Sequence, residues 1–157
     1  MASGELIIRP ARRDDVPALV RLLADDQLGS TREVVSDPPA AAYYAAFDEI
    51  AADANNVILV ATEGDVVLGA LQLTFTPSLS YMGGWRATVE SVRTEATRRG
   101  QGIGSALMRA AIERARQKGC VLMQLTTHGS RVAAHRFYEK LGFKGEHLGM
   151  KLKLRTD

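Results

Sequence analysis

The sequence predicts a single α/β domain in which helices flank a mixed β-sheet. Runs rich in β-branched and apolar residues alternate along the chain with runs in which apolar residues recur at helical spacing. The 157 residues are enough for one domain with a substantial core. A hydrophobic fraction of 46% with 24% charged residues is ordinary for a globular protein. We therefore treat residues 1–157 as one domain, an α/β sandwich of sheet and helices.

The elements follow in order. Strands are expected over residues 5–9, 57–61, 66–75, 87–94, 121–125 and 150–154. A first helix follows the capping pair Asp14-Asp15, and a second starts at Pro38-Pro39, because proline suits a first helical turn. A third helix covers residues 105–118 and a fourth surrounds Phe137. A turn at 63–65 and a long connection at 77–85 complete the order.

Charge and composition exclude several classes of protein. A net charge of +2 is too small to indicate nucleic-acid binding. One cysteine permits no internal disulfide, and three histidines without paired ligand spacing predict no metal site. Residues 1–5 lack the pattern of a signal peptide, and no apolar run reaches the ~20 residues of a membrane span. We therefore expect a cytoplasmic protein without a membrane partner.

The most informative motif is the loop Arg99-Gly100-Gln101-Gly102-Ile103-Gly104 between the 87–94 strand and the 105–118 helix. Glycines let backbone N–H groups approach an anion, and a helix N-terminus adds free donors and a partial positive charge. Arg98 and Arg99 add full charges. The spacing fits neither the dinucleotide fingerprint nor a P-loop. The loop therefore predicts a binding site for the pyrophosphate of a ligand that neither of these two motifs binds.

A second motif lies one helix and one strand downstream. The stretch Ala134-His135-Arg136-Phe137-Tyr138, continued by Gly142-Phe143, fits the pattern Ala-x-x-Phe-Tyr-x-x-x-Gly-Phe. The two motifs together resemble the GNAT superfamily of acyl-CoA N-acyltransferases, over roughly residues 56–154. The resemblance implies a mostly antiparallel mixed sheet with about four helices. It also implies direct transfer of an acetyl group from acetyl-CoA to a primary amine.

The resemblance also implies a set of cofactor contacts. Val92 and Thr94 offer backbone contacts to the pantetheine arm, and the Val92 N–H polarises the thioester carbonyl. Many superfamily members carry asparagine where this chain has Arg131, which cannot accept a hydrogen bond, so that contact is altered or replaced by Ser130 or water. The full set of cofactor-binding candidates is Val92, Arg93, Thr94, Arg99, Gly100, Gln101, Gly102, Ile103, Gly104, Ser105 and Arg131.

Tyr138 is the candidate that protonates the departing thiolate, by resemblance to the matching family tyrosine. It lies one residue off the stripe that Ala134, Phe137 and Leu141 form, and we expect that stripe to be buried. The alternative is an aromatic side chain that only packs against the core or the cofactor.

Glu90 is the candidate general base that deprotonates the amine. In a regular strand it faces the same side as Val92 and Thr94, and a bulge would reverse this. The alternatives are a carboxylate paired with Arg86, Arg93 or Lys151, and deprotonation through water.

The acceptor is not identified by the sequence. Asp25 and Asp26 are candidates to attract a cationic amine, and Tyr81 and Trp85 are candidates to form an apolar or cation–π wall around it. The alternative is that the two aspartates only mark a solvated helix end and that the two aromatic residues belong to a loop that packs in a dimer. The stretch 134–138 also resembles the matching part of aminoalkylphosphonate N-acetyltransferases, too briefly to assign a substrate. Alternatives to the enzyme are a non-catalytic CoA-binding or sensor module on the same fold and transfer of another acyl group. A homodimer is expected as a possible assembly.

Overall fold

The computed structural model describes residues 4–155 of the chain, so the first three residues of the segment tested for a signal peptide lie outside the described part. The chain divides into two compact units, one reaching to Met123 and a smaller one from Gln124 onward. Among the described residues, no helix has both the length and the apolar character needed to cross a membrane.

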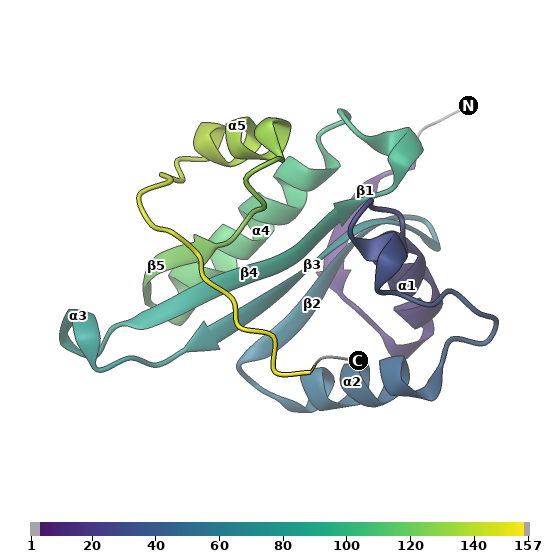
Figure 1. Ribbon diagram of the computed structural model, residues 1–157, viewed down its shortest axis with the longest axis horizontal. Helices are drawn as coiled ribbons and strands as arrows, with labels where there is room; N and C mark the ends of the chain where they lie inside the picture. The colour runs from purple at the N-terminus through teal and green to yellow at the C-terminus, as the bar shows by residue number, and fades with distance from the viewer. Residues whose placement is uncertain (1–3, 156–157) are drawn as a thin grey trace. The chain divides into compact units, whose positions relative to one another are not determined.

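A five-stranded mixed sheet with the strand order β1-β2-β3-β4-β5 organises the first unit (Figure 1). The strands are β1 (Leu6–Pro10), β2 (Asn56–Glu63), β3 (Val66–Thr76), β4 (Trp85–Thr94) and β5 (Cys120–Leu125). The first four strands pair antiparallel in sequence order. The predicted fold class is confirmed, although the strands β2 and β3 extend beyond the predicted bounds.

Helices cover both faces of this sheet. Helices α1 (Val16–Ala24) and α2 (Ala41–Ala52) pack on one face through a cluster of buried residues: Val16, Leu19, Val20, Leu22, Phe47, Val60 and Ala70. Helix α4 (Ile103–Lys118) packs on the other face, close enough that a Cβ added to Gly69 would lie 3.0 Å from Ile103 and 3.1 Å from Leu107. Burial of apolar side chains on both faces is the main source of the stability of this unit.

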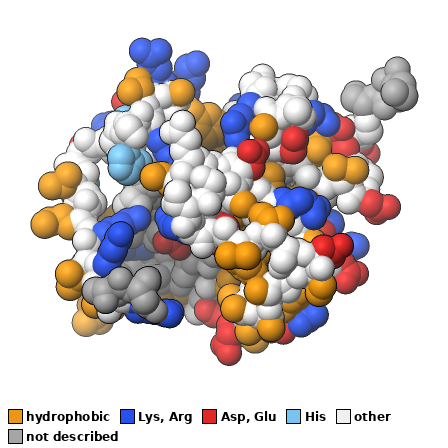
Figure 2. All heavy atoms as spheres, turned by 45° about the vertical axis from the view of Figure 1, so that its right-hand side comes forward, with side chains coloured by type: hydrophobic (Ala, Val, Ile, Leu, Met, Phe, Trp, Pro, Cys, Tyr) orange, Lys and Arg blue, Asp and Glu red, His pale blue; other side chains and the backbone are white. Residues whose placement is uncertain are grey.

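Two short elements lie in the connections. The turn α3 (Ser80–Gly83) carries Tyr81 and Met82 at positive φ, and their side chains point into solvent. Three 3-10 turns, η1 (Arg13–Asp15), η2 (Gly29–Thr31) and η3 (Ala96–Arg98), precede α1, follow it and precede the glycine loop. Basic and acidic side chains both occur on the face drawn in Figure 2.

The second unit contains α5 (Val132–Lys140). Two predictions fail here. The segment 150–154 is not a strand, because it pairs with no other strand among the described residues. None of the residues of α5 is fully buried, and Phe137 is half-buried, so the expected buried stripe of this helix is only partly covered.

Candidate active site

The glycine loop lies where the sequence predicted it, between η3 and the N-terminus of α4. Gly100 and Gly102 have φ of +77° and +83°, and a Cβ added at either would meet no heavy atom within 4 Å. Gly102 is the N-cap of α4 and provides no side-chain cap, and no acidic residue occupies the first turn. The helix, which begins at Ile103 instead of the predicted Ser105, therefore presents free N–H donors and a positive dipole end to open space.

Arg98, beside the loop, has a fixed carboxylate partner. Arg98 donates two hydrogen bonds to Glu63, of 2.7 Å and 3.1 Å, and its Nε donates to the side chain of Gln101 at 2.8 Å. The hydrogen bonds from Arg98 lower the pKa of the Glu63 carboxyl. Arg98 and the Gln101 side chain thus brace the loop, which leaves the backbone N–H of Gln101 as the group available to an anion.

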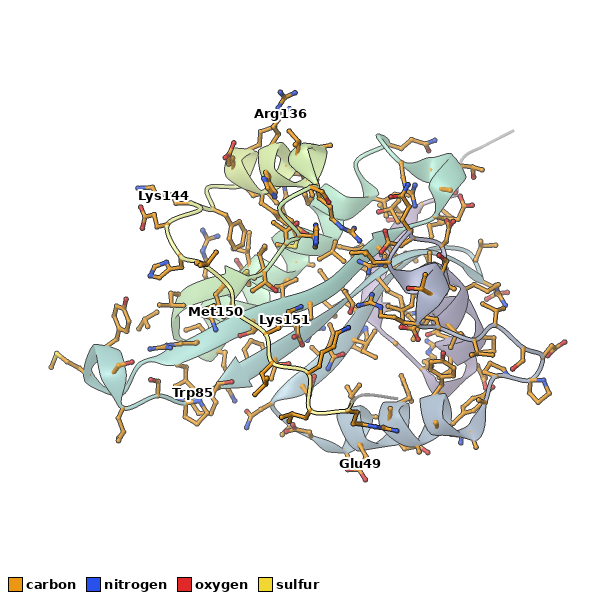
Figure 3. The ribbon with its side chains drawn as sticks, viewed as in Figure 1. Glu49, Trp85, Arg136, Lys144, Met150 and Lys151 are labelled. Carbon is orange, nitrogen blue, oxygen red and sulfur yellow. The ribbon has the colours of Figure 1, made fainter. Side chains whose placement is uncertain are left out.

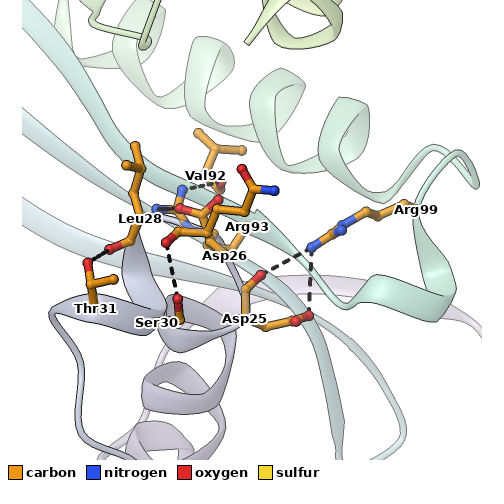
Figure 4. A network of polar contacts seen from close by, with 9 residues as sticks. Asp25, Asp26, Leu28, Ser30, Thr31, Val92, Arg93 and Arg99 are labelled. Carbon is orange, nitrogen blue, oxygen red and sulfur yellow. Dashed lines mark hydrogen bonds and ion pairs between the residues drawn. The ribbon is translucent and has the colours of Figure 1, made fainter. Parts of the chain in front are cut away.

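Arg99 lies across from the loop that follows α1 (Figure 4). Its Nη2 donates to the carbonyl oxygen of Asp25 at 3.2 Å and lies 3.6 Å from the Asp25 carboxylate. Both side chains are more than half exposed, at 58% and 53%. Such exposed pairs contribute little to stability, so the contact with Asp25 holds Arg99 only weakly.

Strand β4 contains a bulge beside this loop. Glu90 pairs with Gln72 and Arg93 pairs with Ala70, so Ser91 and Val92 together lie opposite the single residue Leu71. Ser91 has φ +54°, a left-handed conformation that costs a non-glycine residue about 1–2 kcal/mol. Bulges of this kind interrupt the hydrogen-bond ladder and redirect side chains, often next to active sites.

The bulge overturns the predicted side-chain parity of Glu90. Gln72 and Ala70 are two residues apart on β3, so their partners Glu90 and Arg93 share one face of the sheet. Thr94 pairs with Gly69 and lies on the opposite face, where α4 packs. Glu90 therefore faces the α1 side and does not share a face with Thr94, because the extra residue reverses the alternation.

A pocket of about 70 Å³ opens on the α1 side of this bulge. Its walls are mostly apolar and combine α1 with the middle of the sheet; the lining residues are Leu19, Leu22, Leu23, Ile58, Ala70, Leu71, Gln72, Ser91 and Arg93. The sequence analysis missed all of these except Arg93. The spacing of apolar residues in α1 and in the strands identifies most of these residues only as apolar. The bulge that opens the pocket depends on the register between β3 and β4, which the sequence does not reveal.

Arg93, which lines the pocket, forms an ion pair with Asp26. The Arg93 Nη2 lies 3.5 Å from the Asp26 carboxylate, and its Nη1 donates to the carbonyl of Val92 at 2.9 Å. Both side chains are only 16% exposed. The two aspartates that were candidates to attract an amine thus pair with arginines instead. Within residues 4–123 Glu90 forms no ion pair, so the alternative of a pair with Arg86 or Arg93 is not found.

Tyr138 lies on α5 among other aromatic side chains of the second unit. Its ring centroid is 5.1 Å from that of Phe137 and 5.9 Å from that of Phe143, the second pair edge-to-face. Arg131 is the N-cap residue of the same helix. Nearby, the Ser130 hydroxyl contacts the His128 ring at 2.7 Å, and the His135 ring lies 3.1 Å from the carbonyl of His128. Both histidines therefore fix the turn that precedes α5.

The possible metal ligands and the candidates for an acceptor wall can also be located in the structure. Among the described residues, no group of three or more histidine, cysteine or acidic side chains is arranged to hold a metal. Trp85, a candidate for an acceptor wall, lies at the start of β4 (Figure 3). The Lys118 ammonium lies 4.5 Å from its ring centroid. Arg86 lies over the Tyr81 ring at 5.7 Å. These cation–π contacts stabilise the start of β4 and the adjoining turn.

An interrupted strand beside a glycine-lined helix N-terminus is an arrangement that suits a phosphate-bearing ligand on an α/β scaffold. Residues 18–143 match the model of the acetyltransferase (GNAT) family. The chain therefore belongs to the GNAT family of acetyltransferases.

Individual relatives agree with this assignment. The chain is 35% identical over 95 residues to an aminoalkylphosphonate N-acetyltransferase of Salmonella typhimurium, a match that covers 60% of the chain and 61% of the relative. It is 30% identical over 141 residues to an L-methionine sulfoximine/L-methionine sulfone acetyltransferase of Pseudomonas aeruginosa, covering 87% of the chain and 79% of the relative. A crystal structure of a transcriptional regulator from Bacillus halodurans superposes with a TM-score of 0.93 at 51% identity, covering 96% of this chain and all (100%) of that one.

Proposed function

We propose that this protein transfers an acetyl group from acetyl-CoA to the primary amine of a small molecule, by direct attack in a ternary complex. The observation that carries the proposal is the β4 bulge at Ser91, next to the glycine-lined N-terminus of α4. The bulge frees backbone groups of β4 to bind acetyl-CoA, and the N-terminus of α4 supplies hydrogen-bond donors for the cofactor's pyrophosphate.

The cofactor side of the site uses mostly backbone. The N–H groups from Gly100 to Ser105 bind the pyrophosphate, and Arg99 adds a cation once it leaves Asp25. Val92 and Thr94 hold the pantetheine arm, and the Val92 N–H stabilises the negative charge that develops on the thioester oxygen. By the family resemblance, Arg131 is a further candidate contact to the pantetheine arm.

The reaction needs two proton transfers. The amine nitrogen attacks the thioester carbon, a C–N bond forms, and the C–S bond breaks. Glu90 accepts the proton that the amine loses, directly or through water, from the face that it shares with the pocket. Tyr138 donates a proton to the departing thiolate. An amine with a pKa near ~10.4 needs such a base at neutral pH.

The pocket at the bulge is the proposed site of the acceptor. Its apolar walls suit a short carbon chain, and Gln72, Ser91 and Arg93 are the polar residues among those that line it. The Salmonella and Pseudomonas relatives are named for small amines that carry an acidic or strongly polar group. A small polar amine is therefore our proposed class of acceptor.

An assay of thiol release tests the function directly. The protein is incubated with acetyl-CoA and a panel that includes aminoalkylphosphonates, methionine sulfone, amino sugars, polyamines, aminoglycosides and peptides. We expect release of CoA that depends on the amine and is highest with a small polar amine. Tight CoA binding without turnover on any amine would favour the non-catalytic CoA-binding module. Turnover with a longer acyl-CoA alone would identify a different acyl donor.

A further inference from the structure

An ion pair between Arg93 and Asp26 lies at the pocket beside the β4 bulge (Figure 4). Arg93 lines this pocket, and its Nη2 lies 3.5 Å from the Asp26 carboxylate. Each side chain is 16% exposed, so both charges are largely removed from water. The partly buried pair of Arg98 with Glu63 is bidentate, with distances of 2.7 Å and 3.1 Å. A shorter, two-point contact of that kind would bind Arg93 more strongly than Asp26 does.

Backbone hydrogen bonds fix Asp26 in the turn that follows α1. Its N–H donates to the carbonyl of Ala24 at 2.9 Å, and its carbonyl accepts from the N–H of Ser30 at 2.8 Å. Neither bond involves the side chain, so replacement of the carboxylate should leave the turn in place. The turn thus presents a carboxylate to Arg93 in the position where the acid group of a small ligand would bind.

Glu90 and Arg93 place opposite charges along one face of β4. Their partners on β3, Gln72 and Ala70, are two residues apart, so the two positions are roughly 7 Å apart at ~3.4 Å per residue. Side chains at that spacing can bind the ammonium group and the acid group of one small molecule. A second contact of this kind would hold the amine in a fixed orientation for attack.

We propose that the acceptor is a short aminoalkyl acid, whose carboxylate or phosphonate group binds the Arg93 guanidinium in place of Asp26 while its amine lies at Glu90. This inference rests on the proposed function, because it names the acceptor of that reaction. Arg93 is then a specificity-determining residue, since its planar guanidinium donates parallel hydrogen bonds that an acid accepts and a neutral group cannot match. Asp26 compensates the charge of Arg93 while no acceptor is bound.

The side chain of Arg93 lies on the acceptor side of the sheet. Its partner Ala70 belongs to the cluster of buried residues through which α1 packs, and Ala70 also lines the pocket. Thr94 lies on the opposite face, where α4 packs. A contact of Arg93 with the cofactor would therefore use its backbone, and the guanidinium is left to the acceptor.

The first experiment compares β-alanine with β-alaninamide, which has nearly the same size and the same amine position but no acid group. Calorimetric titration in the presence of CoA measures the Kd of each compound without turnover, and release of CoA from acetyl-CoA measures kcat and KM. We expect β-alanine to bind more tightly by roughly 10- to 150-fold, the effect of a hydrogen bond to a charged group. A parallel titration with 2-aminoethylphosphonate shows whether the site prefers a planar or a tetrahedral acid.

The second experiment removes the two charges. Asp26→Asn/Arg93→Gln replaces both, so that neither charge is left buried alone, and this variant should bind β-alanine and β-alaninamide equally. Asp26→Asn by itself removes the competing carboxylate, so it should bind β-alanine a few-fold more tightly than the wild type. The matched control Arg9→Gln/Asp15→Asn removes a pair of similar burial, 21% and 10% exposed, away from the pocket. It should lower Tm and keep the preference for the acid.

Each remaining outcome has a distinct meaning. Equal binding of acid and amide by the wild type, or no binding of either acid, would overturn the proposal even if other amines are acetylated. A preference for the acid that survives in Asp26→Asn/Arg93→Gln would place the acid elsewhere and overturn it too. Loss of CoA affinity in that variant with an unchanged acid preference would assign Arg93 to the cofactor. Tight binding of an acid without release of CoA would support the acid site and count against acetyl transfer to this class of amine.

Discussion

Substitution of Gly102 by valine is the sharpest test of the phosphate cradle, because the chain provides its own control. Gly102 is the N-cap of α4 with φ +83°, and Gly119 is the C-cap of the same helix with φ +82°. A Cβ at either position meets no heavy atom within 4 Å. The two substitutions therefore differ in what an incoming ligand meets and not in the strain that they place on the backbone.

The cost in stability follows from the backbone alone. A left-handed conformation costs an L-residue about 1–2 kcal/mol. For a chain of this size that corresponds to a fall in Tm of roughly 2–8 °C. We expect Gly102→Val and Gly119→Val to lower Tm by similar amounts and to leave the protein folded, as circular dichroism and thermal unfolding will show.

The cost in CoA affinity should separate the two variants. A valine side chain at Gly102 occupies the space of a phosphate oxygen and removes at least one charge-assisted hydrogen bond, about 1.5–3 kcal/mol. That is a rise in Kd of roughly 10- to 150-fold, measured by calorimetric titration with CoA. Gly119→Val should bind CoA as the wild type does. Unchanged affinity for Gly102→Val, or an equal loss in both variants, would refute the cradle and leave the glycines with a role in helix packing only.

Four further predictions concern charged and proton-transferring side chains, three in the candidate site and one, Asp15, outside it. Tyr138→Phe should lower kcat by roughly 10²- to 10⁴-fold with little change in CoA affinity. Glu90→Gln should also lower the rate, and the rate should recover as pH rises, because alkaline solution deprotonates the amine without a base. A wild-type pH–rate profile for Glu90→Gln would mean that water, and not Glu90, deprotonates the amine. Asp25→Asn should tighten CoA binding a few-fold, about 0.5–1 kcal/mol, because it releases Arg99 to bind the cofactor. The control Asp48→Asn breaks an ion pair of similar exposure with Arg13 and should leave CoA affinity unchanged. Equal effects of the two substitutions would refute the idea that Asp25 competes with the cofactor for Arg99. Burial alone would raise the pKa of the Asp15 carboxyl, but hydrogen bonds from an arginine and from a backbone N–H lower that pKa overall. The ionised carboxylate therefore stabilises the fold above the unfolded pKa of about 3.9, and this stabilisation is lost as pH falls. Asp15→Asn should cost about 1.5–3 kcal/mol of stability at pH 7, and this difference from the wild type should shrink in acid denaturation curves below pH 4.

Local patterns in the sequence were sufficient to predict most of the order of the elements up to α5, and the glycine loop before α4. The spacing of glycines before a helix and the apolar periodicity of α1 and α4 depend only on neighbours along the chain. Both can therefore be predicted from the sequence without knowledge of the fold. The motifs around Gly102 and Phe137 likewise indicated the GNAT family, which the comparison with the family model confirms.

The bulge in β4 and the partners of the charged side chains were decided only by tertiary structure. A bulge arises from the pairing of β3 with β4, and no property of residues 90–93 alone reveals that Leu71 faces two of them. The ion pairs of Arg98 with Glu63 and of Arg99 with Asp25 join residues 35 and 74 positions apart. The C-terminal segment shows the complementary case: its alternation specifies a strand, but a strand exists only where a second one pairs with it. Sequence determines which face of an element is apolar, and long-range pairing determines which side chains meet there.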